Sequence, residues 1–358
     1  MHRIEEKMAE KIKLAQGAGG ELMDSFIKEK ILKYFGKGSD LTEIPLSMLD
    51  DAAVVDDIVF STDSHTVSPI IYPGGDIGHL AVAGTINDVS VLGAKPIALS
   101  AGFIIEEGLS SKTFDTIVKS MGKCADDAGV PIVTGDTKVV EKGAIQEFMI
   151  NTSGIGKRTK LLDDNIKTVK SYRKFNSRWL IDSNLVKGDK IILSGNIGEH
   201  GIALMSYREG ISFETKIKSD VAPINDLLEN SLKVGGLVSA KDPTRGGLSN
   251  TLNEFSDKSK IGILVDEDAV PIPTGVRSAC DMLGIDPLEI GNEGKVVIGV
   301  VKEKAEDILS VIKKHPLGKN AAIIGEVTNS VKGVVLETTV GGKRSLHKPI
   351  GDPVPRIC

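Results

Sequence analysis

The apolar positions in the first half of the chain form short runs that are separated by glycine-rich or acidic turns. Runs of β-prone residues alternate with segments in which apolar side chains recur every three or four positions, the period of an amphipathic helix. This pattern predicts strands at 53–55, 58–61, 97–105, 132–133 and 148–156, and helices from Leu22 to Ile31 and at 111–128. Strands that alternate with helices are typical of an α/β domain.

The second half of the chain repeats this alternation. Strands are expected at 191–194, 322–327 and 334–337, with a loop that leads into a buried strand at 291–301, and helices at 203–209, 227–234 and 305–315. A chain of 358 residues is too long for one typical core, so we expect two α/β domains. The predicted segments are a lead-in (1–40), a first domain (41–156), a connection that contains an insertion (157–187), a second domain (188–344) and a tail (345–358).

The composition argues against several classes of partner. Charged residues make up 26% of the chain and the formal net charge is −5, so nothing favours nucleic acid or an anionic membrane. Aromatic residues make up only 4%, which leaves few surfaces on which bases could stack. The longest apolar runs, such as 296–301, are far shorter than the roughly 20 residues that cross a bilayer. We therefore expect a cytoplasmic protein with no nucleic-acid or membrane partner.

The three cysteines favour a reducing compartment. Cys124, Cys280 and Cys358 are widely separated and show no CxxC or Cys/His ligand spacing. Cys124 and Cys280 lie in helix-like contexts, where small buried thiols are expected. Cys358 is different because it is the last residue of the chain.

The last fourteen residues predict an extended arm with a usable thiol at its tip. Pro349, Pro353 and Pro355 each fix φ and lack a backbone donor, so neither a helix nor a central strand can run through them. Arg356 stands two residues before Cys358 and offsets the repulsion between a thiolate and the adjacent α-carboxylate. From the tail alone, a frayed end with an accidental thiol remains an equal alternative.

Glycines near the N-terminus open a predicted helix. Gly17, Gly19 and Gly20 lead into the amphipathic segment that begins at Leu22. A glycine-rich turn at a helix N-terminus offers backbone N–H groups to an anion such as phosphate. The spacing matches neither GxxxxGK[ST] nor GxGxxG after a strand, so a plain turn remains an alternative.

Acidic residues recur in turns at the ends of predicted elements. Asp51 and Asp63 lie at strand ends, and Asn87 and Asp88 lie in a helix-like run. Asp136, Thr137 and Lys138 fall where the strand at 132–133 is expected to break. Asp242 and Arg245 precede two glycines at a helix start, an arrangement suited to metal and phosphate. Carboxylates from separate elements suit Mg²⁺, which takes few protein ligands and completes its octahedron with water and phosphate.

These motifs together resemble those of a known superfamily. The specific marks are GAGG at 17–20, STDS at 61–64, YPGGDIG at 72–78, TGDTKVV at 134–140, DPTRGG at 242–247, NEGK at 292–295, HPLGK at 315–319 and PRIC at 355–358. The acidic turns resemble the ATP-binding superfamily of aminoimidazole ribonucleotide synthetase, selenophosphate synthetase and thiamine-monophosphate kinase. The combination of TGDTKVV with terminal PRIC resembles one family within it, the hydrogenase maturation proteins HypE, over nearly the whole chain.

The resemblance implies a fold, an activity and partners. The fold is the two-domain α/β (α+β) aminoimidazole-ribonucleotide-synthetase-like fold with an extended C-terminal tail. The family accepts a carbamoyl group on its C-terminal cysteine from the carbamoyltransferase HypF and dehydrates it to a thiocyanate at the expense of ATP. The nitrile passes through the HypC–HypD complex to become a cyanide ligand of the [NiFe]-hydrogenase iron. Family members also pair through the first domain, so we expect a homodimer.

Residue roles follow from the same resemblance. Cys358 carries the substrate, and Lys138 and Glu293 remove protons from the carboxamide. The acids expected to hold Mg²⁺ are Asp51, Asp63, Asp88, Asp136 and Asp242. The residues expected to bind ATP are these five together with Gly17, Gly19, Gly20, Asn87, Thr137 and Arg245. Family members cross the 157–187 stretch in about half as many residues, which implies an insertion there.

Two other functions are compatible with parts of the sequence. A small-molecule kinase or synthetase of the same superfamily would share the acidic turns but would have no reason to end in PRIC. Selenophosphate synthetase in addition needs a cysteine or selenocysteine near the glycine loop, where this chain has Ala18. A metal chaperone would use the terminal thiol as a ligand, but one cysteine without Cys/His neighbours is a poor site for a soft metal.

Overall fold

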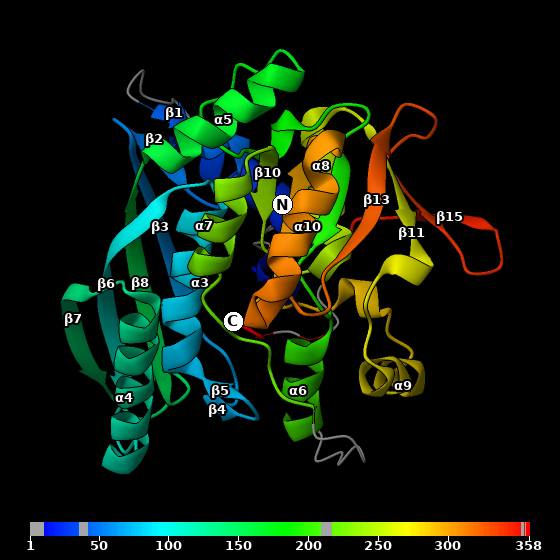
Figure 1. Cartoon of the computed structure of the whole chain (residues 1–358). Coiled ribbons are helices and arrows are strands. Elements are labelled where there is room, and N and C mark those ends of the chain that lie inside the picture. The colour runs from blue at the N-terminus through cyan, green and yellow to red at the C-terminus, as the bar shows by residue number, and fades with distance from the viewer. Residues whose placement is uncertain (1–10, 36–41, 209–216, 352–353, 355) are drawn as a thin grey trace, which may run out of the picture.

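The computed structural model describes residues 11–35, 42–208, 217–351, 354 and 356–358 (Figure 1). Residues 1–10 and 36–40 of the predicted lead-in, together with Pro353 and Pro355 of the predicted arm, lie outside the described residues. Within this part of the chain, no helix is long and apolar enough to cross a membrane.

The first domain is built on a six-stranded sheet with the order β1-β2-β3-β8-β6-β7. Neighbouring strands are antiparallel except β6 and β7, which are parallel. The strands are β1 (Thr42–Ile44), β2 (Ala53–Val55), β3 (Ile58–His65), β6 (Lys95–Glu106), β7 (Ile132–Val140) and β8 (Phe148–Lys157), with a separate hairpin of β4 (Ile71–Tyr72) and β5 (Gly75–Asp76).

Strand β7 corrects one sequence prediction. The sequence predicts a break after Val133, but the strand continues to Val140. The reason is its partner: β6 continues alongside β7, pairing from Ser100 with Thr134 to Glu106 with Val140. The polar residues of this stretch therefore lie on an exposed edge strand and not in a turn.

Helices cover one face of this sheet (Figure 1). They are α3 (Ile77–Val91) and α4 (Ser111–Ala128). The chain before the sheet forms η1 (Leu14–Gly17), α1 (Gly20–Phe26), the π-helical turn η2 (Ile27–Leu32) and α2 (Lys33–Phe35), and η3 (Leu46–Met48) lies between β1 and β2. Helix α3 is buried on nearly every side because it packs against β3, β8 and α4 and also against α7 and β10 of the second domain. Its sequence is apolar on most sides and has no amphipathic stripe, as expected of a helix that is buried all round.

The second domain has a seven-stranded sheet with the order β10-β12-β9-β13-β11-β14-β15. Its strands are β9 (Lys190–Leu193), β10 (Leu237–Lys241), β11 (Gly262–Asp266), β12 (Val297–Val300), β13 (Ala322–Thr328), β14 (Val334–Glu337) and β15 (Lys343–Leu346). Its helices are α6 (Glu199–Arg208), α7 (Asn225–Val234), α8 (Gly247–Ser259), α9 (Thr274–Leu283) and α10 (Ala305–Lys314), with short turns η5 (Glu267–Ala269), η6 (Pro287–Glu289), η7 (Lys302–Lys304) and η8 (Pro316–Gly318).

The predicted connection is an ordered part of the second domain. It contains helix α5 (Lys160–Tyr172) and η4 (Asp182–Asn184), and α5 packs against α7 and β10. The side chain of Asn165 accepts from the N–H of Leu237 and donates to its carbonyl, both at 2.9 Å. Trp179 is buried and donates its indole N–H to Glu43 Oε2 at 3.2 Å, which ties the connection back to β1.

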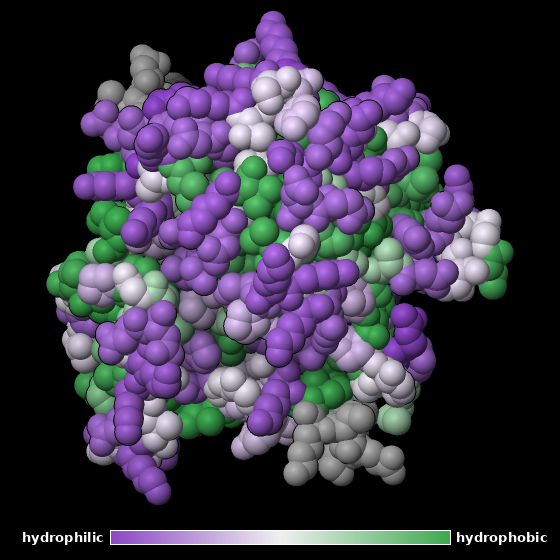
Figure 2. Space-filling model, in the orientation of Figure 1, coloured by the Kyte–Doolittle hydropathy of each residue, from purple (hydrophilic) through white to green (hydrophobic). Residues whose placement is uncertain are grey.

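The other face of the first sheet exposes hydrophobic side chains. Phe60, Ile104 and Ile155 are 37 to 45% exposed there. The strand register places them on one face, because Phe60 is paired with Ile155 across β3 and β8 and Ile104 lies on the same side of β6. Hydrophobic side chains are also visible at the edge of the molecule where β6, β7 and β8 lie (Figure 2). We call this surface the open face.

A partly buried lysine joins the two domains. Lys258 on α8 donates to Asp50 Oδ1 at 3.0 Å, to Asp182 Oδ2 at 2.6 Å and to the carbonyl of Leu49 at 2.6 Å. Burial and the neighbouring Asp182 raise the pKa of Asp50 to about 7, although Lys258 works in the opposite direction. Two carboxyl groups that are 2% exposed thus share this cation, and Asp182 also lies 3.4 Å from Lys241.

Replacing Lys258 with methionine should therefore destabilise the protein by about 3 kcal/mol, since buried carboxyl groups lose their cation. Lys313→Met is the matched control, because Lys313 is an exposed lysine on α10 and its loss should cost at most about 0.5 kcal/mol. Denaturant unfolding of both variants measures the difference. Equal stability of the two variants would contradict the bridging role of Lys258.

Candidate functional site

A cavity of about 640 Å³ lies where the first domain, the second domain and the end of the tail meet. Many of the residues predicted to act in a site line it: Gly19, Gly20, Asp51, Asp63, Asp88, Asp242, Arg245, Glu293 and Cys358. They come from elements far apart in the sequence, so the domain packing brings them together. The cavity is the candidate active site.

The carboxyl groups in this cavity repel one another. Burial raises the pKa of Asp88 well above its usual value, and the charges of Asp242, Asp63 and Asp51 raise it further. Burial, followed by the charge of Asp51, raises the pKa of Asp242 to about 7. Ser61 Oγ donates to Asp88 Oδ2 at 2.6 Å, which fixes the orientation of that carboxyl group on α3.

Asp51 and Asp63 each lie near a basic side chain. Lys241 at the end of β10 lies 2.5 Å from Asp51 and 3.2 Å from Glu254, and burial still leaves the pKa of Asp51 raised. Burial works to raise the pKa of Asp63, but His65 and Arg245 outweigh it, so that pKa is lowered. Asp63 is therefore ionised more readily than Asp51, Asp88 or Asp242.

The donor set fits Mg²⁺ carried by a nucleotide better than a preformed metal centre. Among the described residues, no three Asp, Glu, His or Cys side chains converge closely enough to hold a metal ion. Mg²⁺ commonly binds one or two carboxylates together with water and phosphate oxygens. Separate carboxylates around an open volume, with their pKa values raised by mutual repulsion, satisfy that requirement.

Arg245 lies beside the terminal cysteine. The negative charge at Cys358 is the main cause that raises the pKa of Arg245, ahead of the charges of Asp63 and Glu293. Gly19 packs against this arginine so closely that a Cβ at Gly19 would lie 2.8 Å from Arg245 Cβ. The arginine is thus held between the glycine loop, the acids and the tail.

The glycine loop also touches the tail. A Cβ at Gly20 would lie 2.1 Å from the carbonyl oxygen of Pro349, and φ at Gly20 is +70°. The next residue, Glu21, donates its N–H to that same carbonyl at 3.0 Å. The structure therefore places Gly19 and Gly20 at the cavity wall and gives each of them a close contact. Gly17 lies outside the cavity, at the end of η1, with open space around it.

Glu293 is buried with one oxygen unpaired. Its Oε1 has no hydrogen-bond partner, and its backbone N–H donates to Asp220 Oδ1 at 3.1 Å. Burial raises the pKa of Glu293 well above its usual value, and the charges of Asp242 and Asp63 add to the effect. An unpaired carboxyl oxygen in the wall that also contains Cys358 is suited to exchange a proton with a group on that cysteine.

The structure does not bring Asn87 into the cavity, although the sequence predicts that it binds the nucleotide. Its side chain accepts from the N–H of Ile224 at 2.9 Å and donates to the carbonyls of Ala222 and Glu293, both at 3.3 Å. With both amide hydrogens and one lone pair of its oxygen used, Asn87 joins α3 to the loop that carries Glu293. It positions that loop.

Asp136, Thr137 and Lys138 also lie outside the cavity of their own chain. They are on β7, where Lys138 donates to Asp136 at 2.6 Å and both side chains are well exposed. The register places Asp136 and Lys138 beside Gly102 and Ile104, on the open face of the sheet. Sequence reasoning grouped them with the other acids because it expected them in a turn.

Sequence reasoning missed other residues of the cavity wall. Lys241 directly precedes the DPTRGG motif, so its position could have suggested a role. Lys258 and Glu254 also line the cavity, but they lie within α8, Lys258 in its last turn, and belong to no motif. Only the folded structure shows that these two residues face the acids of the first domain.

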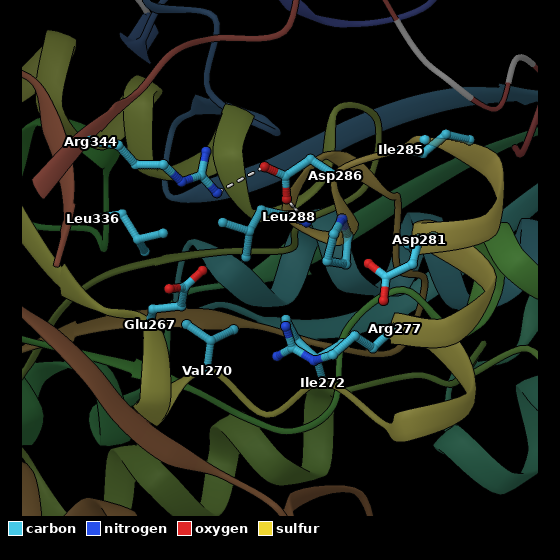
Figure 3. A pocket seen from close by; sticks show the side chains of 13 residues that line it. Glu267, Val270, Ile272, Arg277, Asp281, Ile285, Asp286, Leu288, Leu336 and Arg344 are labelled. Carbon is cyan, nitrogen blue, oxygen red and sulfur yellow. Dashed lines mark hydrogen bonds and ion pairs between the residues drawn. The ribbon is translucent and has the colours of Figure 1, made fainter. Parts of the chain in front are cut away.

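A second cavity, of about 410 Å³, lies in the second domain beside α9 and β14 (Figure 3). Arg277 and Glu267 point into it, and Arg344 donates to Asp286 at its rim at 2.9 Å. It contains none of the predicted site residues. It therefore does not compete with the cavity at Cys358 as the candidate active site.

Comparison with known proteins shows the family of the chain. Residues 49–157 match the family model of the N-terminal domain of AIR synthase related proteins, and residues 186–337 match that of the C-terminal domain. A putative hydrogenase expression/formation protein of Methanocaldococcus jannaschii is 50% identical over 97% of this chain and 100% of its own length. The carbamoyl dehydratase HypE of Escherichia coli is 40% identical over 97% of this chain and 99% of its own.

Solved structures of HypE also match this chain over most of its length. A HypE described as in complex with ATP is 41% identical, with a TM-score of 0.77 over 97% of this chain and 100% of that one. The HypE–HypF complex contains a chain that is 43% identical, with a TM-score of 0.81 over 91% of this chain and 100% of that one. These matches span nearly the whole chain, and the two family models cover most of both domains. The chain belongs to the HypE family of carbamoyl dehydratases, within the AIR synthase related proteins.

Proposed function

We propose that this protein accepts a carbamoyl group on the sulfur of Cys358 and dehydrates it to a thiocyanate with ATP and Mg²⁺. The product would supply the cyanide ligands of the [NiFe]-hydrogenase iron in the cytoplasm. The observation that carries the proposal is that Cys358 lines the same cavity as Asp51, Asp63, Asp88, Asp242 and Glu293. The carbamoyl donor would be HypF, a partner supported by the solved HypE–HypF complex, and the acceptor would be HypC–HypD.

The reaction defines what the cavity must do. A cysteine S-carboxamide and ATP give a cysteine thiocyanate, ADP and phosphate, so the carboxamide loses its oxygen and two protons. The oxygen is a poor leaving group until a phosphoryl group is attached to it. Bound Mg-ATP supplies that phosphoryl group and neutralises the charge that develops. The chain itself must orient the thiocarbamate, accept the protons and keep water out.

Residues in the cavity wall match these tasks. Asp51, Asp63, Asp88 and Asp242 would hold Mg²⁺ directly or through water. Arg245 would hold the tail end in place by its attraction to the charge at Cys358. Glu293 would accept a proton from the carboxamide nitrogen, because the burial that raises its pKa also makes it a stronger base once a nearby cation leaves it ionised.

Lys138 requires a second copy of the chain. On its own chain it lies on the open face next to Ile104, and the exposed Ile155 and Phe60 lie on the same face. A symmetric dimer through this face would bury them and complete the sheet. The cavity opens at this same face, since Phe60 and Thr62 line it, so a partner's edge strand could reach it. In this arrangement Asp136 and Lys138 act in the cavity of the other subunit.

The small-molecule kinase alternative is weaker. Thiamine-monophosphate kinase complexed with a nucleotide analogue shares the fold at 16% identity, which carries no activity over to this chain. The cavity wall here contains the chain's own terminal cysteine, which a kinase for a free substrate does not need.

Glu293→Gln should leave carbamoylation of Cys358 intact and slow its dehydration by about 100-fold or more, since a positioned base contributes that much. Cys358→Ser should give no thiocyanate. Glu306→Gln, an exposed change on α10, is the control and should behave as wild type. Mass spectrometry of the C-terminal peptide after incubation with HypF, carbamoyl phosphate and ATP distinguishes the adducts. Thiocyanate at the normal rate in Glu293→Gln would remove Glu293 from the mechanism.

Mixing two inactive variants tests whether Lys138 acts in the other subunit. Lys138→Ala and Cys358→Ala should each be inactive alone. After subunit exchange, a 1:1 mixture should regain about a quarter of the wild-type activity, since half of the dimers are mixed and each mixed dimer has one intact site. No recovery, although sedimentation shows mixed dimers, would mean that Lys138 acts within its own chain or not at all.

The stability of the metal-free protein should depend on pH through Asp242. Its pKa is about 7 in the folded protein against 3.8 as its ordinary value, so the folded state retains a proton that the unfolded state has lost. The stabilisation present below about pH 4 is therefore lost as the pH rises to about 7. Urea unfolding should show the wild type losing stability relative to Asp242→Asn over this range, and Mg²⁺ at pH 8 restoring it. A difference that does not change with pH would contradict the assignment.

A further inference from the structure

The loop that carries Glu293 lies on a segment without regular structure, residues 217–224, which comes directly before α7. The N–H of Glu293 donates to Asp220 Oδ1 at 3.1 Å, and its carbonyl accepts from the N–H of Ala222 at 3.4 Å and from Asn87 at 3.3 Å. Among the described residues, none donates a hydrogen bond to Oε1 of this glutamate. The position of its carboxyl group therefore depends on how its backbone is held.

Asp220 contacts three consecutive residues of that loop. Its Oδ1 accepts from the N–H of Glu293, and its Oδ2 forms an ion pair with Nζ of Lys295 at 3.0 Å. Between these two, a Cβ at Gly294 would lie 1.9 Å from the backbone carbonyl oxygen of Asp220, so the close approach requires glycine. A carboxylate suits this place because its two oxygens serve the N–H and the ammonium group at once, and hydrogen bonds to a charged acceptor are strong.

Asp220 and Lys295 lie behind the cavity wall. Their side chains are 2% and 8% exposed. Glu293 lines the cavity together with Cys358, but neither residue of the ion pair does. The pair therefore has no group that could touch a substrate on Cys358, and it can affect the reaction by setting where the carboxyl group of Glu293 lies.

The first domain supports this segment through the turn of the YPGGDIG motif, to which the proposed function gives no role. The carbonyl of Pro73 accepts from the N–H of Ser219 at 2.8 Å. A Cβ at Gly74 would lie 2.7 Å from the nitrogen of Ser219, and one at Gly75 would lie 2.8 Å from Cγ1 of Val221. The turn thus holds the residues on both sides of the aspartate.

We propose that Asp220, paired with Lys295, is a positioning residue for the base Glu293, and that the turn at 73–75 holds Asp220 in place. This inference rests on the proposed function, because Glu293 is taken to accept a proton from the carboxamide. Its carboxyl group must then come within about 3 Å of the nitrogen that carries the proton, so a small shift of its backbone slows the transfer. The YPGGDIG and NEGK motifs form one unit, in which the first domain sets the position of a base in the second.

Two double variants separate the hydrogen bond from the ion pair. Asp220→Asn with Lys295→Gln keeps an acceptor for the N–H of Glu293 and replaces the ion pair with two neutral amides, whereas Asp220→Ala with Lys295→Gln lacks the acceptor. Mass spectrometry follows thiocyanate formation in one turnover, starting from isolated protein that carries a carbamoyl group on Cys358. The asparagine form should stay within about threefold of the wild-type rate, and the alanine form should be at least about tenfold slower. Equal rates in the two forms would overturn the role of Asp220.

The same comparison in a Glu293→Gln chain shows whether Asp220 acts through Glu293. Once the base is gone, the asparagine and alanine forms should differ by less than about twofold, because the effects of coupled residues are not additive. A full tenfold difference would mean that Asp220 acts by another route, and would overturn the proposal. Failure of the proposed function looks different, since Glu293→Gln alone would then form thiocyanate at the normal rate.

A matched pair of glycines tests the turn. Gly74 and Gly188 both have φ of +97°, so alanine at either position imposes similar backbone strain. At Gly74 the new Cβ meets the 217–224 segment, whereas at Gly188 nothing in the described part of the chain lies within 4 Å of it. Gly74→Ala should slow the dehydration several-fold, and Gly188→Ala should leave it unchanged. Equal dehydration rates in the two variants would overturn the role of the turn.

Discussion

Repulsion among carboxyl groups that are buried in one cavity is the constraint on which the rest of the structure depends. Asp51, Asp88 and Asp242 come from different elements, and burial together with the charges of neighbouring carboxylates raises the pKa of each. Such a cluster is tolerable only where cations are close, and Lys241 and Arg245 are placed at its edge. The cluster therefore favours the binding of a further cation, and a bound Mg²⁺ would provide that charge.

The two domains and the tail are joined through the same region. Helix α3 carries Asp88 into the cavity and Asn87 into the loop before β12, so one helix sets the position of both a carboxylate and Glu293. The glycine loop contacts Arg245 on one side and Pro349 on the other. A shift of either domain would therefore move the acids, the base and the thiol relative to one another. This coupling explains why a cavity built from so many segments can hold a single arrangement.

Much of this arrangement could be predicted from the sequence, and the failures have physical causes. The helix at 111–128 and the glycine start of α8 follow local rules of periodicity and capping, and both predictions are confirmed. The course of β7 depends on pairing with β6, and the use of Asn87 depends on α7 and the loop before β12, which no local pattern contains. Asp220, which contacts the loop of Glu293, belongs to no recognised motif, because the group that it accepts from is a backbone N–H.

The central claim is that ATP activates the oxygen of a carbamoyl group carried on Cys358, and the fate of that oxygen tests it most directly. The measurement starts from protein whose Cys358 carries a carbamoyl group labelled with ¹⁸O, and follows the label after ATP and Mg²⁺ are added in unlabelled water. We expect one ¹⁸O atom in each phosphate released, together with a thiocyanate on Cys358. Unlabelled phosphate, with the ¹⁸O found in water, would contradict phosphoryl activation of the carbamoyl oxygen in this cavity.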